Sequence, residues 1–92
     1  MTKKYIRQYV RYHADNDREY IDGTKEQGVA WFSKYYSDAP SLVYRIEITR
    51  SPWWKKNRPN YTVRYLFDGK LTDCENGLNV DAVVRCVQSF LS

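Results

Sequence analysis

Two prolines, Pro52 and Pro59, bracket a segment that can be neither a regular strand nor a helix, and this segment limits what the chain can fold into. Residues 41–50 before it and residues 60–67 after it are rich in β-branched and aromatic types, and their apolar side chains alternate with period two. This alternation predicts two strands. We therefore expect a hairpin in which the proline-bracketed segment is the long connection.

Two further strands are predicted from local signals. The Asp68-Gly69 pair is typical of a two-residue hairpin turn, because both positions of such a turn need a positive φ, and it predicts a short strand over 70–74. Residues 3–12 alternate with period two and contain several β-branched and aromatic side chains, so we predict the first strand of the chain there.

Two helices are predicted from capping signals. Thr24, with Gln27 three residues later, has the spacing of a capping box and predicts a helix that ends at residues 37–40. Asn79 is a second N-cap candidate. The apolar residues after it recur with helical spacing, at Val80, Val83, Val84, Val87 and Leu91.

The predicted element order is β-α-β-β-β-α over one domain, residues 1–92. We expect an α+β fold of two layers, with a mostly antiparallel four-stranded sheet and both helices on one of its faces. The other face of the sheet would then meet solvent.

The positive charge of the chain is concentrated in two blocks. Residues 1–12 carry four positive charges and no acid, and residues 41–65 carry six against one acid, although the net charge is only +4. No apolar run approaches the roughly 20 residues needed to span a bilayer, and the N-terminal residues lack the apolar stretch of a signal peptide. We expect a soluble, cytoplasmic protein.

No set of residues in the sequence has the spacing of a known catalytic or metal site. His13 is the single histidine, and no histidine or cysteine spacing supplies the further ligands that a zinc site needs. The four glycines are scattered, so no phosphate-binding loop is formed. Cys74 and Cys86 are too few for a disulfide scaffold; we expect both free, with a disulfide between them as the alternative. We expect no catalytic residue, metal or cofactor, and an enzyme is the least favoured alternative.

The outer face of the predicted sheet is the first candidate binding surface. Interleaved aromatic and arginine side chains are what single-stranded nucleic acid binding uses, because bases stack on rings and cations meet phosphates. The candidates are Tyr5, Arg7, Tyr9, Arg11, Arg45 and Arg64. The alternative is cross-strand stacking of arginine on tyrosine without a ligand. Glu47, in the middle of this face, counts against a track of phosphates.

The proline-bracketed segment is the second candidate. It carries two adjacent tryptophans and three cations, namely Trp53, Trp54, Lys55, Lys56 and Arg58. Tryptophan and arginine are enriched at interface hot spots, and the cations would steer the segment toward a negative surface. The alternative is that one tryptophan folds back and covers the edge of the core.

The format of the chain resembles that of small phage-encoded inhibitors of host defence, the anti-CRISPR proteins. The shared features are a short single domain, no catalytic set, and a hairpin-plus-helix ending formed by residues 61–67, Asp68-Gly69 and residues 79–91. The resemblance implies binding to an RNA-guided surveillance complex and a block on its access to target DNA. Many of those inhibitors are acidic DNA mimics, whereas this chain is basic. An inhibitor of this kind should therefore contact acidic protein surface or the backbone of the guide RNA.

The sequence thus favours a non-enzymatic binding protein of phage or mobile-element type that docks on a host protein or ribonucleoprotein complex. Trp53 and Trp54 would anchor it. The alternative is an autonomous module that binds single-stranded DNA or RNA through Tyr5, Arg7, Tyr9 and Arg11.

Overall fold

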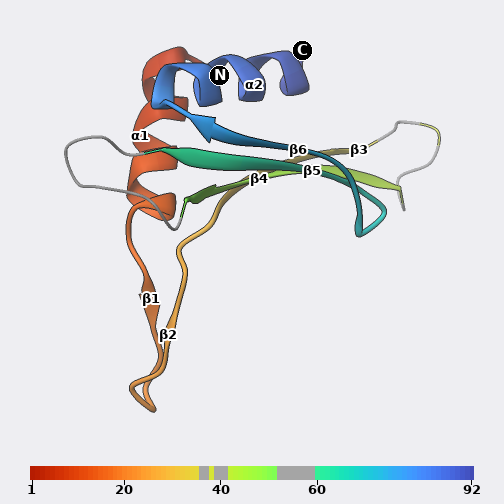
Figure 1. Cartoon of the computed structure of the whole chain (residues 1–92). Coiled ribbons are helices and arrows are strands. Elements are labelled where there is room, and N and C mark those ends of the chain that lie inside the picture. The colour runs from red at the N-terminus through yellow and green to blue at the C-terminus, as the bar shows by residue number, and fades with distance from the viewer. Residues whose placement is uncertain (36–37, 39–41, 52–59) are drawn as a thin grey trace.

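The computed structural model describes residues 1–35, 38, 42–51 and 60–92. Eight elements follow one another in these residues: α1 (Lys3–Ala14), β1 (Arg18–Glu19), β2 (Lys25–Glu26), β3 (Ala30–Tyr35), β4 (Val43–Arg50), β5 (Tyr61–Phe67), β6 (Lys70–Leu78) and α2 (Val80–Leu91). Strands β3 to β6 form an antiparallel sheet in the order β3-β4-β5-β6, and β1 pairs with β2 in a separate hairpin. Figure 1 shows this hairpin projecting from the body of the molecule.

The core lies between the sheet and the two helices, which gives the two layers of an α+β fold. Helix α1 packs on β3 and β4, helix α2 packs on β4, β5 and β6, and the two helices contact each other. The inner face of the sheet contributes Ala30, Phe32, Ile46, Ile48 and Val63 to this core. The predicted class, with a four-stranded antiparallel sheet and two helices on one face, is confirmed.

The strand predicted over 3–12 is wrong, because these residues form α1. Ile6, Val10 and Ala14 recur every four residues and are fully buried, as one helix face requires. The side chain of Thr2 accepts the Tyr5 N–H at 3.1 Å and caps the helix. The alternation seen in the sequence is therefore coincidental, and the four-residue spacing of the apolar side chains decides the structure.

The helix predicted from Thr24 is also wrong, because this part of the chain forms β2 and β3. Both the N–H and the hydroxyl of Thr24 donate to Asp22, so Thr24 belongs to a turn. Gln27 donates to the Arg50 carbonyl across the sheet at 2.6 Å instead of closing a capping box. Ala30 and Phe32 are buried with strand alternation. The first strand and the first helix of the predicted order are thus exchanged.

The second half of the chain follows the prediction. Strands β4 and β5 pair in register from Tyr44 opposite Phe67 to Arg50 opposite Tyr61. Asp68 and Gly69 have φ values of 50° and 79°, as the predicted turn requires. Strand β6 extends beyond the predicted 70–74, to Leu78, through a bulge in its register with β5.

Helix α2 begins after Asn79, whose side chain accepts the Ala82 N–H at 2.8 Å. Cys74 and Cys86 are both free, and Cys86 packs half-buried against the core. Within the described ranges, neither helix is long and apolar enough to cross a membrane.

Candidate binding surface on helix α1 and strand β3

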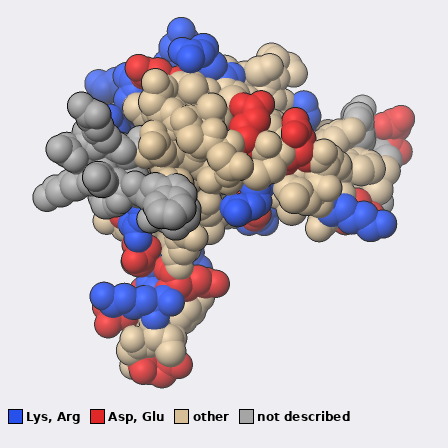
Figure 2. Space-filling model, in the orientation of Figure 1, with Lys and Arg blue, Asp and Glu red and all other residues tan. Residues whose placement is uncertain are grey.

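Helix α1 combines four cations with no acidic residue. Lys3 and Lys4 occupy its first turn, where the helix dipole is positive, so their charges add to the dipole instead of compensating it. Lys4 and Arg11 are exposed and form no ion pair with any described residue. Figure 2 shows Lys and Arg atoms gathered over the end of the molecule where α1 begins. This end of the molecule is therefore a positively charged surface.

The four residues predicted to share one strand face separate on the helix. Residues two positions apart are rotated by about 200° around the helix axis. Tyr5 and Tyr9 therefore lie on one side of the helix, and Arg7 and Arg11 lie on another. Arg7 is held by Asp81 of α2, with Nη2 and Oδ1 2.5 Å apart. The prediction of a single interleaved face is wrong. Of the two arginines only Arg11 faces solvent without an ion-pair partner among the described residues.

Aromatic rings form a row along α1 that continues onto β3. The ring centroids of Tyr5 and Tyr9 are 6.2 Å apart, and those of Tyr9 and His13 are 4.3 Å apart. Tyr9 also packs 4.9 Å from Phe32, and its hydroxyl donates to the Trp31 carbonyl at 3.3 Å. Three rings face solvent here: Tyr5 at the start of this row, Tyr12, whose ring centroid lies 5.0 Å from that of His13, and Trp31 on β3 are 51%, 71% and 44% exposed. We call the solvent-facing residues Lys4, Tyr5, Arg11, Tyr12 and Trp31 the basic–aromatic surface.

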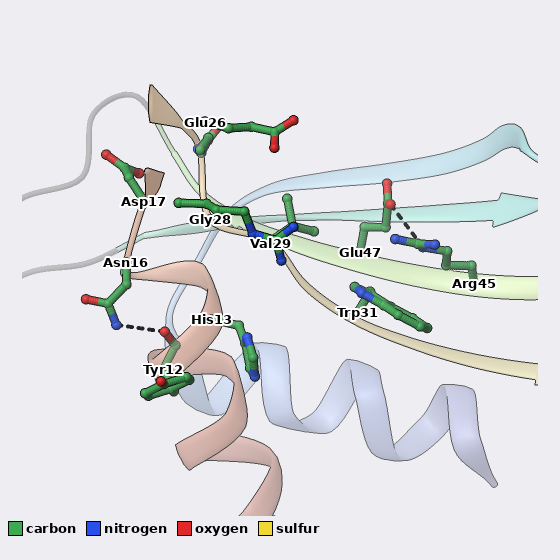
Figure 3. A pocket seen from close by; sticks show the side chains of 12 residues that line it. Tyr12, His13, Asn16, Asp17, Glu26, Gly28, Val29, Trp31, Arg45 and Glu47 are labelled. Carbon is green, nitrogen blue, oxygen red and sulfur yellow. Dashed lines mark hydrogen bonds and ion pairs between the residues drawn. The ribbon is translucent and has the colours of Figure 1, made fainter. Parts of the chain in front are cut away.

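A cavity of about 710 Å³ lies where the C-terminal end of α1 meets the β3 edge of the sheet. Figure 3 shows the residues that line it: Tyr12 and His13 are on α1, and Trp31, Arg45 and Glu47 are on the sheet. This volume is in the range of sites for small ligands, about 300–1,000 Å³. The cavity therefore has the volume of a small-ligand site.

Arg45 stacks on Trp31 at the sheet side of this cavity. Its guanidinium carbon lies 4.3 Å from the centroid of the Trp31 ring, and its Nε lies 3.0 Å from Glu47 Oε2. Arg64, on the neighbouring strand, is opposite Glu47 in register and donates to the Thr49 hydroxyl at 3.2 Å. Arg45 and Arg64 do share the outer face of the sheet, with Glu47 between them. The ring that Arg45 covers is a tryptophan, so intramolecular stacking of arginine on an aromatic ring, the alternative to a ligand, is present at this position.

Gly28 fixes the cavity wall against the end of α1. A Cβ at this position would lie 2.1 Å from the Asn16 carbonyl oxygen and 2.3 Å from that of His13, so no side chain fits. Nearby, Arg50 Nη2 donates to the Asp17 carboxylate at 2.5 Å. The Arg50 hydrogen bond, assisted by the Gly28 N–H, lowers the pKa of Asp17.

The carboxylates around the cavity therefore have partners. Asp17 binds Arg50, Glu47 binds Arg45, and Glu26 accepts the Tyr20 hydroxyl. The cavity is close to electrically balanced, whereas Lys3, Lys4 and Arg11 of α1 have no ion-pair partner among the described residues. Within the described residues, no group of three or more His, Cys, Asp and Glu side chains could hold a metal ion.

Trp53, Trp54, Lys55, Lys56 and Arg58 lie outside the described residues, so the second candidate surface stays a prediction. Sequence reasoning missed the role of Tyr12 and Trp31, because one was assigned to a strand and the other to a helix. The strand period of β3, with Ala30 and Phe32 inward, would have placed Trp31 outward.

No protein-family model, curated protein or solved structure matches this chain.

Proposed function

We propose that this protein is a non-enzymatic binding protein that docks on a nucleoprotein complex and contacts its nucleic acid through the basic–aromatic surface. The observation that carries the proposal is the acid-free helix α1, with Lys4 and Arg11 exposed on one side of the helix and the rings of Tyr5 and Tyr12 exposed on the adjoining side. Exposed rings stack on bases, at about 1–3 kcal/mol per base, and neighbouring cations meet phosphates.

The number of available cations favours a complex over free nucleic acid as the main partner. Lys3, Lys4 and Arg11 are the exposed cations of α1. Each phosphate contact changes the slope of log K against log salt by about 0.7–0.9, so roughly three contacts give only modest affinity at physiological salt. Further contacts with protein would supply the rest.

The resemblance in format to anti-CRISPR proteins makes an RNA-guided surveillance complex in the host cytoplasm the partner that we propose. Binding there would block the complex from its target nucleic acid. The positive surface of α1 suits the phosphate backbone of a guide RNA. In this respect it differs from the acidic inhibitors, which imitate the phosphates of DNA.

A second candidate function is an autonomous module for single-stranded DNA or RNA. The cavity favours it, because the rings of Tyr12, His13 and Trp31 line it together with the cations Arg18 and Arg45. Such a module would bind free oligonucleotides tightly without any protein partner.

Fluorescence anisotropy with a labelled oligouridylate separates these functions. For a docking protein we expect weak binding that falls steeply between about 50 and 200 mM salt. Arg11→Ala should weaken it several-fold, whereas the matched control Lys70→Ala, at the exposed first residue of β6, should leave it unchanged. Tight binding that survives physiological salt would favour the autonomous module. Equal effects of the two substitutions would contradict both functions.

A pull-down from host lysate tests the complex itself. The tagged protein should retain a protein partner after nuclease treatment, and more of that partner should be recovered when the nucleic acid is intact. Recovery that disappears entirely with nuclease would instead indicate binding to nucleic acid alone.

A further inference from the structure

The β1–β2 hairpin stands apart from the folded body. Figure 1 shows it extending away from the sheet and both helices. Residues 16–27 are all exposed, and β1 and β2 make their main contacts with each other. The hairpin therefore adds nothing to the core, although it occupies a tenth of a small chain.

The tip of the hairpin is nevertheless rigidly built. The Tyr20 N–H donates to the Thr24 carbonyl and the Gly23 N–H donates to the Tyr20 carbonyl, both at 2.9 Å. Asp22 Oδ1 accepts the N–H and the hydroxyl of Thr24, at 3.0 and 2.7 Å. Gly23 takes the positive φ of 83° that the turn needs. A two-residue ladder is marginal by itself, so these bonds are what hold the tip in one shape.

This tip presents one apolar side chain without any cover. Ile21 is fully exposed, more than any other large hydrophobic residue among the described ones. Tyr20 beside it is 46% exposed, and its hydroxyl donates to Glu26. Burying an isoleucine is worth about 1.5–3 kcal/mol, which this fold leaves unused.

The charges of the hairpin cancel along its strands but not at its tip. Arg18 is opposite Glu26, and Glu19 is opposite Lys25. Asp22 has no ion-pair partner among the described residues. Hydrogen bonds from Thr24 lower the pKa of Asp22, so its carboxylate is ionised at neutral pH. The tip is thus apolar with one negative charge, and a phosphate backbone would be repelled by it.

We propose that the hairpin tip, residues 20–24, is a protein-binding finger: Ile21 enters an apolar pocket of a protein partner, and Asp22 meets a lysine or arginine at the rim of that pocket. This inference rests on the proposed function, since the partner is the protein component of the nucleoprotein complex. The bonded turn is already in its binding shape, so little conformational entropy is lost on docking. The finger then binds the protein component of the partner, and the basic–aromatic surface binds its nucleic acid.

Photo-crosslinking identifies what the finger touches. The full chain would carry a benzophenone amino acid at position 21, with a control that carries it at position 70, and both would be exposed to nuclease-treated host lysate. We expect position 21 to cross-link to one polypeptide that position 70 does not capture. Cross-links from position 21 to nucleic acid, to a second copy of this chain, or to nothing would overturn the proposal.

Affinity for the purified cross-linked polypeptide completes the test. Ile21→Ser should weaken binding by about tenfold or more, as expected for an anchor residue, whereas Ile21→Leu should stay close to wild type. Asp22→Asn keeps an oxygen for the Thr24 bonds and removes the charge, so it should weaken binding several-fold and reduce its salt dependence. Unchanged affinity in Ile21→Ser would overturn the finger.

The two proposals fail separately. Ile21→Ser leaves the basic–aromatic surface intact, so its affinity for oligouridylate should equal that of wild type. If the wild-type protein does not bind oligouridylate but position 21 still cross-links to one polypeptide, the proposed nucleic-acid contact is contradicted and the finger is supported.

Discussion

The basic–aromatic surface and the hairpin tip are both exposed, but different interactions hold them in place. Helix α1 is anchored by the buried face of Ile6, Val10 and Ala14, so its solvent-facing cations and rings stand on a rigid core element. The tip of the hairpin owes its shape to bonds within the turn and to Gly23. A change in the core should therefore disturb the first region, and a change in the turn should disturb only the second.

Gly28→Ala should have the largest effect, because Gly28 lies between the two regions. Its new Cβ would meet the backbone oxygens of Asn16 and His13, which cannot move without displacing the end of α1. We expect a loss of about 1–3 kcal/mol in the free energy of unfolding, measured by urea denaturation. The control Gly23→Ala has open space around it and a strained φ, so it should cost about 1 kcal/mol and leave oligouridylate binding intact. Equal stability of Gly28→Ala and wild type would mean that α1 and the sheet are not in this contact.

Asp17 should give the fold a pH dependence through its contact with Arg50. Arg50 lowers the pKa of Asp17 in the folded state, so the stabilisation is present above the unfolded pKa and is lost as the pH falls through the folded value. Thermal unfolding should therefore show wild type losing more stability than Asp17→Asn below about pH 4. Parallel pH profiles for the two proteins would contradict the Asp17–Arg50 contact.

Arg7→Ala and Arg11→Ala should separate stability from binding within one helix. Arg7 pairs with Asp81 at the surface, so its loss should cost at most about 1 kcal/mol of stability and have little effect on oligonucleotide affinity. Arg11, which has no ion-pair partner among the described residues, should show the reverse. Urea denaturation and anisotropy on both variants check this. If Arg7→Ala has the larger effect on both the free energy of unfolding and the oligonucleotide affinity, the role of α1 is structural only.

The sequence predicted the C-terminal half well and exchanged the first two elements. Strands β4 and β5 are flanked by strong turn signals, and α2 has both a cap and a five-residue apolar stripe. In contrast, residues 3–12 satisfy both a two-residue and a four-residue period, and the four-residue period prevails because its apolar face packs into the core. Thr24 has the spacing of a capping box, yet Asp22 and Gly23 make the local turn more favourable.

The candidate surface was predictable only in part, for the same reason. The basic character of residues 1–12 is visible in the sequence. Which arginine is paired is not, because Arg7 meets Asp81 of α2 only in the folded structure. Trp31 stands beside the cavity because β3 is the edge strand of the sheet, which no local pattern indicates. The finger was missed because a strand of two residues leaves almost no periodic signal.

The salt dependence of oligouridylate affinity, measured for wild type, Arg11→Ala and Ile21→Ser, tests the division between the two regions most directly. We predict a steep decline with salt for wild type and for Ile21→Ser, and weaker binding with a shallower slope for Arg11→Ala. The same slope in Arg11→Ala as in wild type, or a loss of affinity in Ile21→Ser, would contradict the assignment of nucleic acid to α1 and of protein to the hairpin.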